Sequence, residues 1–218
     1  MIISITGFMG CGKSSVGKRL SELLCCRFMD LDEVIVGREG RSIPEIFAED
    51  GEGEFRRMEK EALEDVLRDS GNGEPGQSLP SQAMGPSLCG QRGSTVRAHH
   101  SHCPSKSNSS ILGEETLMVL ALGGGAVMQE ECEEMVHSGT LCIYLRASVK
   151  TLVERLTGES AGRPLLKTSA LRTRILELMA ARSETYERVA HIIIDTDGKS
   201  IDEVAEEIET LRLSPSTR

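Results

Sequence analysis

A glycine-rich octet directly after the first apolar segment constrains this chain more than any other feature. Residues Ile2–Thr6 are largely apolar and β-branched, and the octet Gly7–Ser14 that follows has the spacing G-x-x-x-x-G-K-S. Between a strand and a helix, such an octet wraps phosphate groups in inward-facing backbone N–H groups. The pattern therefore predicts a phosphate-binding loop that joins a buried strand to a helix N-terminus, where the helix adds partial positive charge.

Two side chains of the octet have predicted roles in nucleotide chemistry. Lys13 is expected to reach the β- and γ-phosphates of a nucleotide, and the hydroxyl of Ser14 is expected to bind Mg²⁺. The alternatives are a glycine turn without a ligand and a loop that binds nucleotide without catalysis.

Cys11 lies inside the octet, beside Lys13 and next to the predicted helix N-terminus. Such surroundings lower the pKa of a thiol, which predicts sensitivity to oxidation or alkylation. The alternative is a small residue tolerated at a variable position of the motif.

Apolar strands alternate with amphipathic helices along most of the chain. A composition of 39% hydrophobic and only 3% aromatic residues suits helices packed on a parallel sheet. The predicted strands are Ile2–Thr6, Arg27–Asp30, Leu117–Leu122, Leu141–Leu145 and Ile192–Asp195. The predicted helices are Lys13–Cys25, a helix after Ser42, 54–68, Gln129–His137, Val149–Leu156, Ala170–Val189 and Ile201–Leu211. This alternation predicts an α/β fold of three layers with a five-stranded parallel sheet and helices on both faces.

Residues 69–115 interrupt this alternation, because they are rich in Gly, Ser, Pro, Gln and His and lack apolar periodicity. The segment is predicted to be a disordered insertion. It contains Cys89, His99, His100, His102 and Cys103, but their spacings match no standard zinc module. The tail 214–218 is expected to fray.

Charge and cysteine content exclude several classes of protein. A net charge of −9 disfavours broad attraction to nucleic acid or to an anionic membrane. The seven cysteines form no C-x-x-C pair, and no apolar run approaches the roughly 20 residues that span a bilayer. We therefore expect a reduced, cytoplasmic chain with no nucleic-acid or membrane partner.

Candidate acceptor-side carboxylates follow the second strand. Asp30 and Asp32 lie at its carboxyl end, where ligands collect in open α/β sheets. One carboxylate is expected to serve Mg²⁺ through a water and the other to meet a substrate hydroxyl. The alternative is that either Asp caps the next helix.

Candidate anion-binding groups occur at four later positions. Arg56 lies three residues before Glu59, which can brace it, and Gly123–Gly125 expose backbone N–H groups after the third strand. Arg163 lies in a polar loop, residues 157–168, that is expected to close over ATP, and Arg182 lies in a long helix. Solvated surface charges and a simple tight turn are the corresponding alternatives.

Together these segments resemble the shikimate kinases. The resemblance rests on GFMGCGKSS, DLDEVI, RSIPEIFAEDGEGEFRRME, LALGGGAV, RPLL and the stretch Arg182–Tyr186, and it covers residues 1–68 and about 117–211. It implies the P-loop kinase fold with strand order 2-3-1-4-5 and a mobile lid. It also implies one domain, 1–213, with a substrate-binding subdomain at about 32–68.

The resemblance implies a role for each matching residue. The residues implied to bind ATP are Gly10, Cys11, Gly12, Lys13, Ser14, Ser15, Arg163 and, at an adenine-contacting position, Lys199. Those implied to bind shikimate are Asp32, Arg56, Gly124 and Arg182, with Glu59 and Phe47 lining the same subdomain. Lys13, Asp32 and Arg163 are implied to be catalytic, with Asp32 as general base. Ser14 is implied to bind Mg²⁺ directly and Asp30 through its outer shell.

The implied reaction is phosphorylation of the shikimate 3-hydroxyl by ATP, giving shikimate 3-phosphate and ADP for chorismate and aromatic amino acid biosynthesis. One Mg²⁺ ion would accompany ATP, and the chain is expected to be a monomer. The alternatives are a P-loop kinase for gluconate or a nucleoside monophosphate, and a non-catalytic regulatory ATP-binding homologue. In the family a short turn replaces the insertion, which enters at the amino end of the third strand and is therefore expected to lie away from the ligands.

Overall fold

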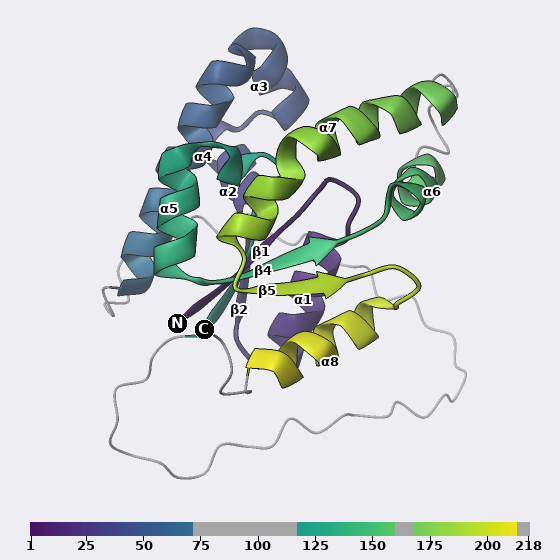
Figure 1. Cartoon of the computed structure of the whole chain (residues 1–218). Helices are drawn as coiled ribbons and strands as arrows, with labels where there is room; N and C mark the ends of the chain where they lie inside the picture. Colours follow the sequence, from purple (N-terminus) through teal and green to yellow (C-terminus); the bar gives the residue numbers. More distant parts are fainter. Residues whose placement is uncertain (72–116, 160–167, 213–218) are drawn as a thin grey trace, which may run out of the picture. The chain divides into compact units, whose positions relative to one another are not determined.

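The computed structural model describes residues 1–71, 117–159 and 168–212, which belong to one compact unit (Figure 1). Most of the predicted insertion at 69–115, the central part of the predicted lid with Arg163, and the tail 214–218 lie outside the described residues.

A five-stranded parallel sheet forms the centre of the fold. Its order is β2-β3-β1-β4-β5, which confirms the predicted fold class and strand order. The strands are β1 (Ile2–Thr6), β2 (Arg27–Asp30), β3 (Met118–Ala121), β4 (Leu141–Arg146) and β5 (Ile192–Asp195). Because β1 is central, the loop that follows it has a neighbouring strand end on each side.

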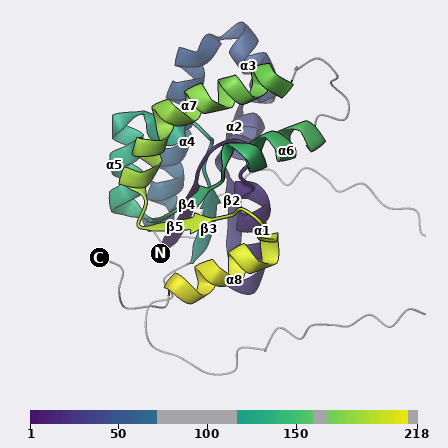
Figure 2. The ribbon, with the colours of Figure 1, turned by 45° about the vertical axis from the view of Figure 1, so that its right-hand side comes forward.

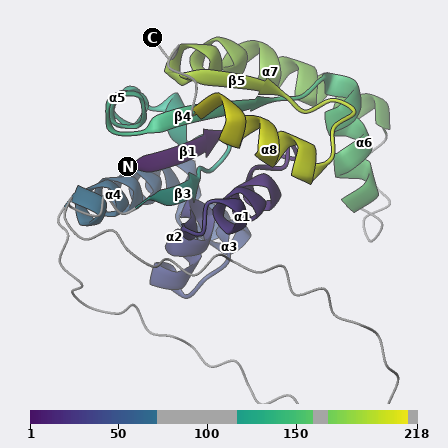
Figure 3. The same cartoon turned by 90° about the horizontal axis from the view of Figure 1, so that it is seen from below.

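Helices connect the strands and cover both faces of the sheet. They are α1 (Lys13–Leu23), α2 (Leu31–Glu39), α3 (Ile43–Glu49), α4 (Gly51–Gly71), the 3₁₀ turn η1 (Ala126–Met128), α5 (Glu130–Gly139), α6 (Val149–Glu159), α7 (Thr168–Val189) and α8 (Ile201–Arg212). Helices α1 and α8 lie on one face, and α4, α5 and α7 lie on the other (Figures 2 and 3). The structure thus has the three layers that the sequence predicted.

Successive side chains of β3 and β4 point into two separate cores, as the pleat of a strand requires. On β3, Val119 packs with Val16 and Leu20 of α1, whereas Leu120 packs in the core that α4, α5 and α7 cover. Burial on both faces explains why these two strands are largely apolar without polar alternation.

Two local features of the helices bear on the site. Ser42 and Glu45 form a capping box at the start of α3, which confirms the predicted N-cap. Helix α4 begins at Gly51, before the predicted start near residue 54, since Gly51 adopts a positive φ of 82° and Glu52 and Glu54 occupy the first turn. None of the described helices combines the length and the apolar character that crossing a membrane would need.

Candidate active site

The loop between β1 and α1 has the backbone that the octet predicted. Gly7, Gly10 and Gly12 have φ values of 143°, 78° and 97°, which residues with a side chain rarely adopt. A Cβ at Gly7 would lie 2.7 Å from the carbonyl oxygen of Leu145, so the loop could not pass β4 so closely with another residue there. Lys13 Nζ donates to the carbonyl oxygens of Gly7 and Phe8, at 3.0 and 3.1 Å. These bonds hold the ammonium group within the curve of the loop.

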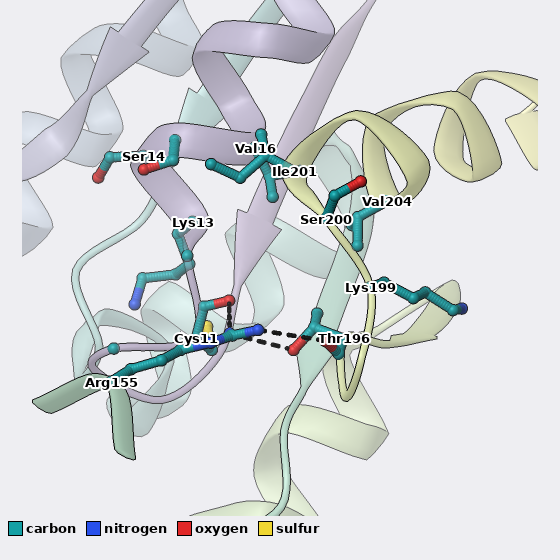
Figure 4. Close-up of a pocket in the computed structure, with 13 residues that line it drawn as sticks. Cys11, Lys13, Ser14, Val16, Arg155, Thr196, Lys199, Ser200, Ile201 and Val204 are labelled. Carbon is teal, nitrogen blue, oxygen red and sulfur yellow. Dashed lines mark hydrogen bonds between the residues drawn. The ribbon is translucent and has the colours of Figure 1, made fainter. Parts of the chain in front are cut away.

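A cavity of about 640 Å³ opens beside this loop, between α1 and the segment that joins β5 to α8. Residues 10–16 of the loop line one wall, and Thr196, Ser200 and Val204 contribute to the other (Figure 4). Its volume is within the range of small-molecule sites, and the helix N-terminus of α1 favours an anionic group there. All six loop residues predicted to bind ATP line this cavity.

Arg155 of α6 lines the same cavity, although the sequence analysis did not single it out. Its Nη1 donates to the Cys11 carbonyl at 3.1 Å and to Thr196 Oγ1 at 3.3 Å, and its Nη2 donates to the Thr196 carbonyl at 3.1 Å (Figure 4). A signal was present: Arg155 lies three residues after the buried Leu152, on a helix that starts at the carboxyl end of β4. The guanidinium group therefore joins the phosphate-binding loop to the end of β5.

Lys199, the other residue predicted to contact ATP outside the loop, also lines the cavity. Its ammonium group pairs with Glu207 at 2.5 Å, and Figure 4 shows the side chain extending away from Lys13 and Ser14. An adenine contact by Lys199 stays a prediction.

The prediction of a lowered pKa for the Cys11 thiol is wrong. Cys11 is only 1% exposed, and burial raises its pKa above the ordinary value, outweighing the opposing effect of Lys13. The thiolate is disfavoured because the side chain lies in the apolar core that also contains Val16 and Leu20, and this burial outweighs the opposing effects of Lys13 and of backbone N–H groups.

Ser14 and Asp30 bring hard oxygen atoms together at the mouth of the loop. Ser14 Oγ donates to Asp30 Oδ2 at 2.5 Å, while Asp30 Oδ1 accepts the Asp32 amide hydrogen at 3.0 Å and so caps α2. A hydroxyl and a carboxylate beside a phosphate site suit Mg²⁺, which takes few protein oxygens and completes its shell with phosphate and water. The two predictions for Asp30, helix capping and a metal outer shell, are therefore compatible.

On the other side of the loop, the glycine turn after β3 lies against side chains from α2 and α4. A Cβ at Gly123 would lie 2.8 Å from Asp32 Oδ1 and still closer to Glu59 Oε1. A Cβ at Gly125 would lie 2.5 Å from Nη2 of Arg56. The absence of side chains at this turn therefore allows Asp32, Glu59 and Arg56 to approach one backbone segment.

Helix α7 brings two further groups to the same turn. Arg182 Nη1 donates to the Gly124 carbonyl at 3.4 Å, and the Tyr186 hydroxyl donates to the same oxygen. A Cβ at Gly124 would lie 3.9 Å from Lys13 Nζ, so the turn also adjoins the phosphate-binding loop. The structure thus gathers Asp32, Arg56, Gly124 and Arg182 around one turn, next to Lys13.

Burial governs the electrostatics of this cluster. Desolvation raises the pKa of Asp32, with Asp30 adding to the effect and Lys13 and Arg56 opposing it. Desolvation likewise raises the pKa of Glu59, which is 1% exposed, against the opposing charge of Arg56. Glu59 pairs with Arg56, as the sequence predicted, and Glu52 holds the same guanidinium at 3.1 Å. Arg56 is therefore oriented before any ligand arrives.

Comparison with known proteins bears on what this arrangement does. The family model described as shikimate kinase matches residues 9–73 and 108–212. The chain belongs to the shikimate kinase family. Curated shikimate kinases from Thermus thermophilus and Geobacter sulfurreducens share 34% identity over 206 residues and 35% over 208 residues with it. These matches span 94% and 95% of this chain and 86% and 88% of those shikimate kinases.

Solved shikimate kinase structures share the fold. One from Acinetobacter baumannii, determined in complex with shikimate, superposes with a TM-score of 0.70 at 26% identity, over 100% of this chain and 95% of that chain. One from Aquifex aeolicus superposes with a TM-score of 0.64 at 26% identity, over 97% and 96%. Membership of the shikimate kinase family argues against the gluconate and nucleoside monophosphate kinase alternatives.

Proposed function

We propose that the chain transfers the γ-phosphoryl group of ATP to the 3-hydroxyl of shikimate, giving shikimate 3-phosphate and ADP. Membership of the shikimate kinase family supports a kinase acting on shikimate. The observation that carries the proposal is the convergence of Asp32, Arg56 and Arg182 on the glycine turn beside Lys13. One carboxylate and two guanidinium groups are what an acceptor with a hydroxyl and a carboxylate requires.

On the acceptor side, we assign Arg56 and Arg182 to the substrate carboxylate, with the backbone of the glycine turn at Gly124 as a further contact. Asp32 accepts the proton of the attacking hydroxyl. Its raised pKa suits this task because a more basic carboxylate accepts a proton more readily. A bond then forms between the hydroxyl oxygen and the γ-phosphorus, the bond from that phosphorus to the β,γ-bridging oxygen breaks, and ADP leaves.

On the donor side, we assign residues 10–15 and Arg155 to ATP, with Lys13 stabilising charge on the transferred phosphoryl group. Arg163, which lies outside the described residues, is assigned to the same phosphoryl group on its sequence position alone. Ser14 and Asp30 would hold one Mg²⁺ ion, directly and through the outer shell, and this ion would neutralise phosphate charge.

We propose that the chain acts as a monomer. We also propose a cytoplasmic location and a single kinase domain, 1–213, in keeping with the free thiols of the described cysteines and with the sheet that unites the described segments. Light scattering on a sizing column tests the monomer directly.

The decisive experiment is ADP release with ATP, Mg²⁺ and shikimate, compared with gluconate as acceptor. We expect turnover with shikimate alone, and a loss of about 10³-fold in kcat for Asp32→Asn, since the hydroxyl proton then has no acceptor. Binding of ATP and shikimate without ADP release would instead favour the non-catalytic alternative. Equal turnover with gluconate would refute the assigned acceptor.

A further inference from the structure

The backbone of the glycine turn is held from one side only. The Gly124 carbonyl accepts hydrogen bonds from the Tyr186 hydroxyl and from Arg182 Nη1, the latter at 3.4 Å. In the part of the chain that the structure describes, the amide N–H groups of Gly123, Gly124 and Gly125 donate no hydrogen bond. The turn therefore has a satisfied carbonyl face and an unsatisfied amide face.

The geometry of the peptide bond connects the two faces. In a trans peptide, the carbonyl of one residue and the N–H of the next point in opposite directions. Fixing the Gly124 carbonyl therefore fixes the direction in which Gly125 N–H points. Glycine residues have no side chain to restrict the turn, so an outside group must supply that restraint.

Tyr186 supplies this restraint on the turn. Its side chain is 1% exposed, and its ring stacks on Tyr144 with 5.2 Å between centroids, which fixes where the hydroxyl lies. Burial raises the pKa of the hydroxyl to about 12, so it remains a hydrogen-bond donor throughout the physiological pH range. The bond spans 62 residues of sequence and ties α7 to the turn.

Arg182 donates to the same carbonyl, and this shared acceptor sets up a competition. Arg182 reaches the oxygen at the limit of hydrogen-bond length, whereas Tyr186 is in close contact with it. Without the tyrosine hydroxyl, the partly buried carbonyl would lack its better donor and would draw the guanidinium closer, because an acceptor that is shielded from water and poorly satisfied is costly. Tyr186 thereby leaves the guanidinium of Arg182 available to an anion.

We propose that Tyr186 is a positioning residue of the acceptor site: its hydroxyl holds the Gly124 carbonyl, so that the amide face of the turn and Arg182 are presented to the carboxylate of the acceptor. The inference rests on the proposed function, because it names shikimate as the anion. Tyr186 acts through Gly124 and Arg182 and does not itself touch the substrate.

The test is Tyr186→Phe, which removes the hydroxyl and keeps the stacked ring. We expect the KM for shikimate to rise about fivefold, as loss of one net hydrogen bond implies, while the KM for ATP changes less than twofold. The matched control is Tyr144→Phe, the other tyrosine of the same stack, which should leave the KM for shikimate unchanged. In an Arg182→Ala background the effect of Tyr186→Phe should be smaller than in wild type, because the competing guanidinium is absent and only the effect on the amide face of the turn remains.

Several results would overturn the assignment. Tyr186 would be only a core residue if Tyr186→Phe left the KM for shikimate unchanged or raised the KM values for shikimate and ATP equally. The same conclusion would follow if the effect of Tyr186→Phe were undiminished in the Arg182→Ala background. Wild-type protein is assayed first, and if it fails to phosphorylate shikimate, it is the proposed function that fails. A wild-type enzyme that turns over with no effect of the variant refutes this inference alone.

A second measurement covers the case in which Tyr186→Phe does not fold. The chain contains two tyrosines, so 3-fluorotyrosine incorporated into Tyr144→Phe labels Tyr186 alone. Shikimate without nucleotide should shift the ¹⁹F resonance of Tyr186, whereas gluconate at the same concentration should not. A resonance that shikimate leaves in place would also refute the assignment.

Discussion

The contact between Gly125 and Arg56 makes Gly125→Ala the most informative substitution in the acceptor site. A Cβ at this position would lie 2.5 Å from Nη2 and 2.7 Å from Cζ of Arg56. The backbone of Gly125 has φ −122° and ψ −1°, which alanine adopts, so the change adds a steric conflict without strain in the turn itself. The flexible end of Arg56 must therefore move.

The size of the effect follows from what Arg56 would lose. Relieving the overlap requires a displacement of roughly 1 Å, because carbon and nitrogen atoms in contact are normally about 3.5 Å apart. A charged group displaced this far no longer makes paired hydrogen bonds, each worth about 1.5–3 kcal/mol. We therefore expect the KM for shikimate to rise about 10- to 100-fold.

Steady-state kinetics with each substrate varied in turn provides the assay. The KM for ATP should change less than twofold, since the nucleotide cavity is lined by other residues. Gly53→Ala is a matched control in the same region: Gly53 lies in α4, and a Cβ there would meet no atom within 4 Å. It should leave both KM values unchanged and stabilise the protein by about 1 kcal/mol, because alanine is the better helix former.

A Gly125→Ala enzyme with a wild-type KM for shikimate would refute the reasoning. It would mean either that Arg56 does not bind the acceptor or that the guanidinium accommodates the methyl group without loss. Thermal unfolding and the KM for ATP together separate a displaced side chain from a disrupted fold. A disrupted fold would lower the melting temperature and also impair ATP binding, whereas a displaced Arg56 side chain would leave ATP binding intact.

Four further expectations address the donor side, the metal and the proton balance. Lys13→Met should lower kcat at least 100-fold in the ADP-release assay, with a wild-type rate counting against its assigned role. Arg155→Ala should raise the KM for ATP about tenfold through loss of its contacts to Cys11 and Thr196, which hold the phosphate-binding loop to the end of β5, and an unchanged value would remove Arg155 from the ATP site. Chelation of the metal by EDTA should abolish turnover. Ser14→Ala should raise the Mg²⁺ concentration that gives the half-maximal rate about tenfold. If that concentration does not change, Ser14 is not a ligand of the metal. Burial raises the folded-state pKa of Asp32 above 3.8, so its contribution to stability is present below pH 3.8 and is lost as the pH rises through the folded value. Asp32→Asn should therefore melt at a higher temperature than wild type at pH 7, with the difference closing toward pH 4, and a less stable variant at pH 7 would contradict the raised pKa.

Much of the fold could be predicted because its signals are local. The strand Ile192–Asp195 was predicted with its observed bounds, since a short β-branched run ends sharply in polar residues. The glycine pattern of the octet and of the triplet predicts the local backbone conformation of each segment. Because each segment follows a strand of a parallel sheet, both lie at the carboxyl edge of that sheet.

What escaped prediction depends on contacts between distant segments. Arg155 reaches the Cys11 carbonyl across 144 residues of sequence, and no local pattern shows that contact. The same reason explains the error at Cys11: its neighbours Lys13 and the helix N-terminus are visible in the sequence, whereas the core that buries its thiol is not. The hydroxyl of Tyr186 meets Gly124 only after α7 has packed on the sheet.

The central place of β1 in the sheet has a kinetic consequence. Its loop lies between the turn after β3, which gathers Asp32 and Arg56, and the segment after β5, which lines the nucleotide cavity. ATP and the acceptor thus have separate binding sites on either side of Lys13, and neither ligand needs to leave before the other binds. Double-reciprocal plots should therefore converge rather than run parallel, and no phosphorylated protein should accumulate during turnover.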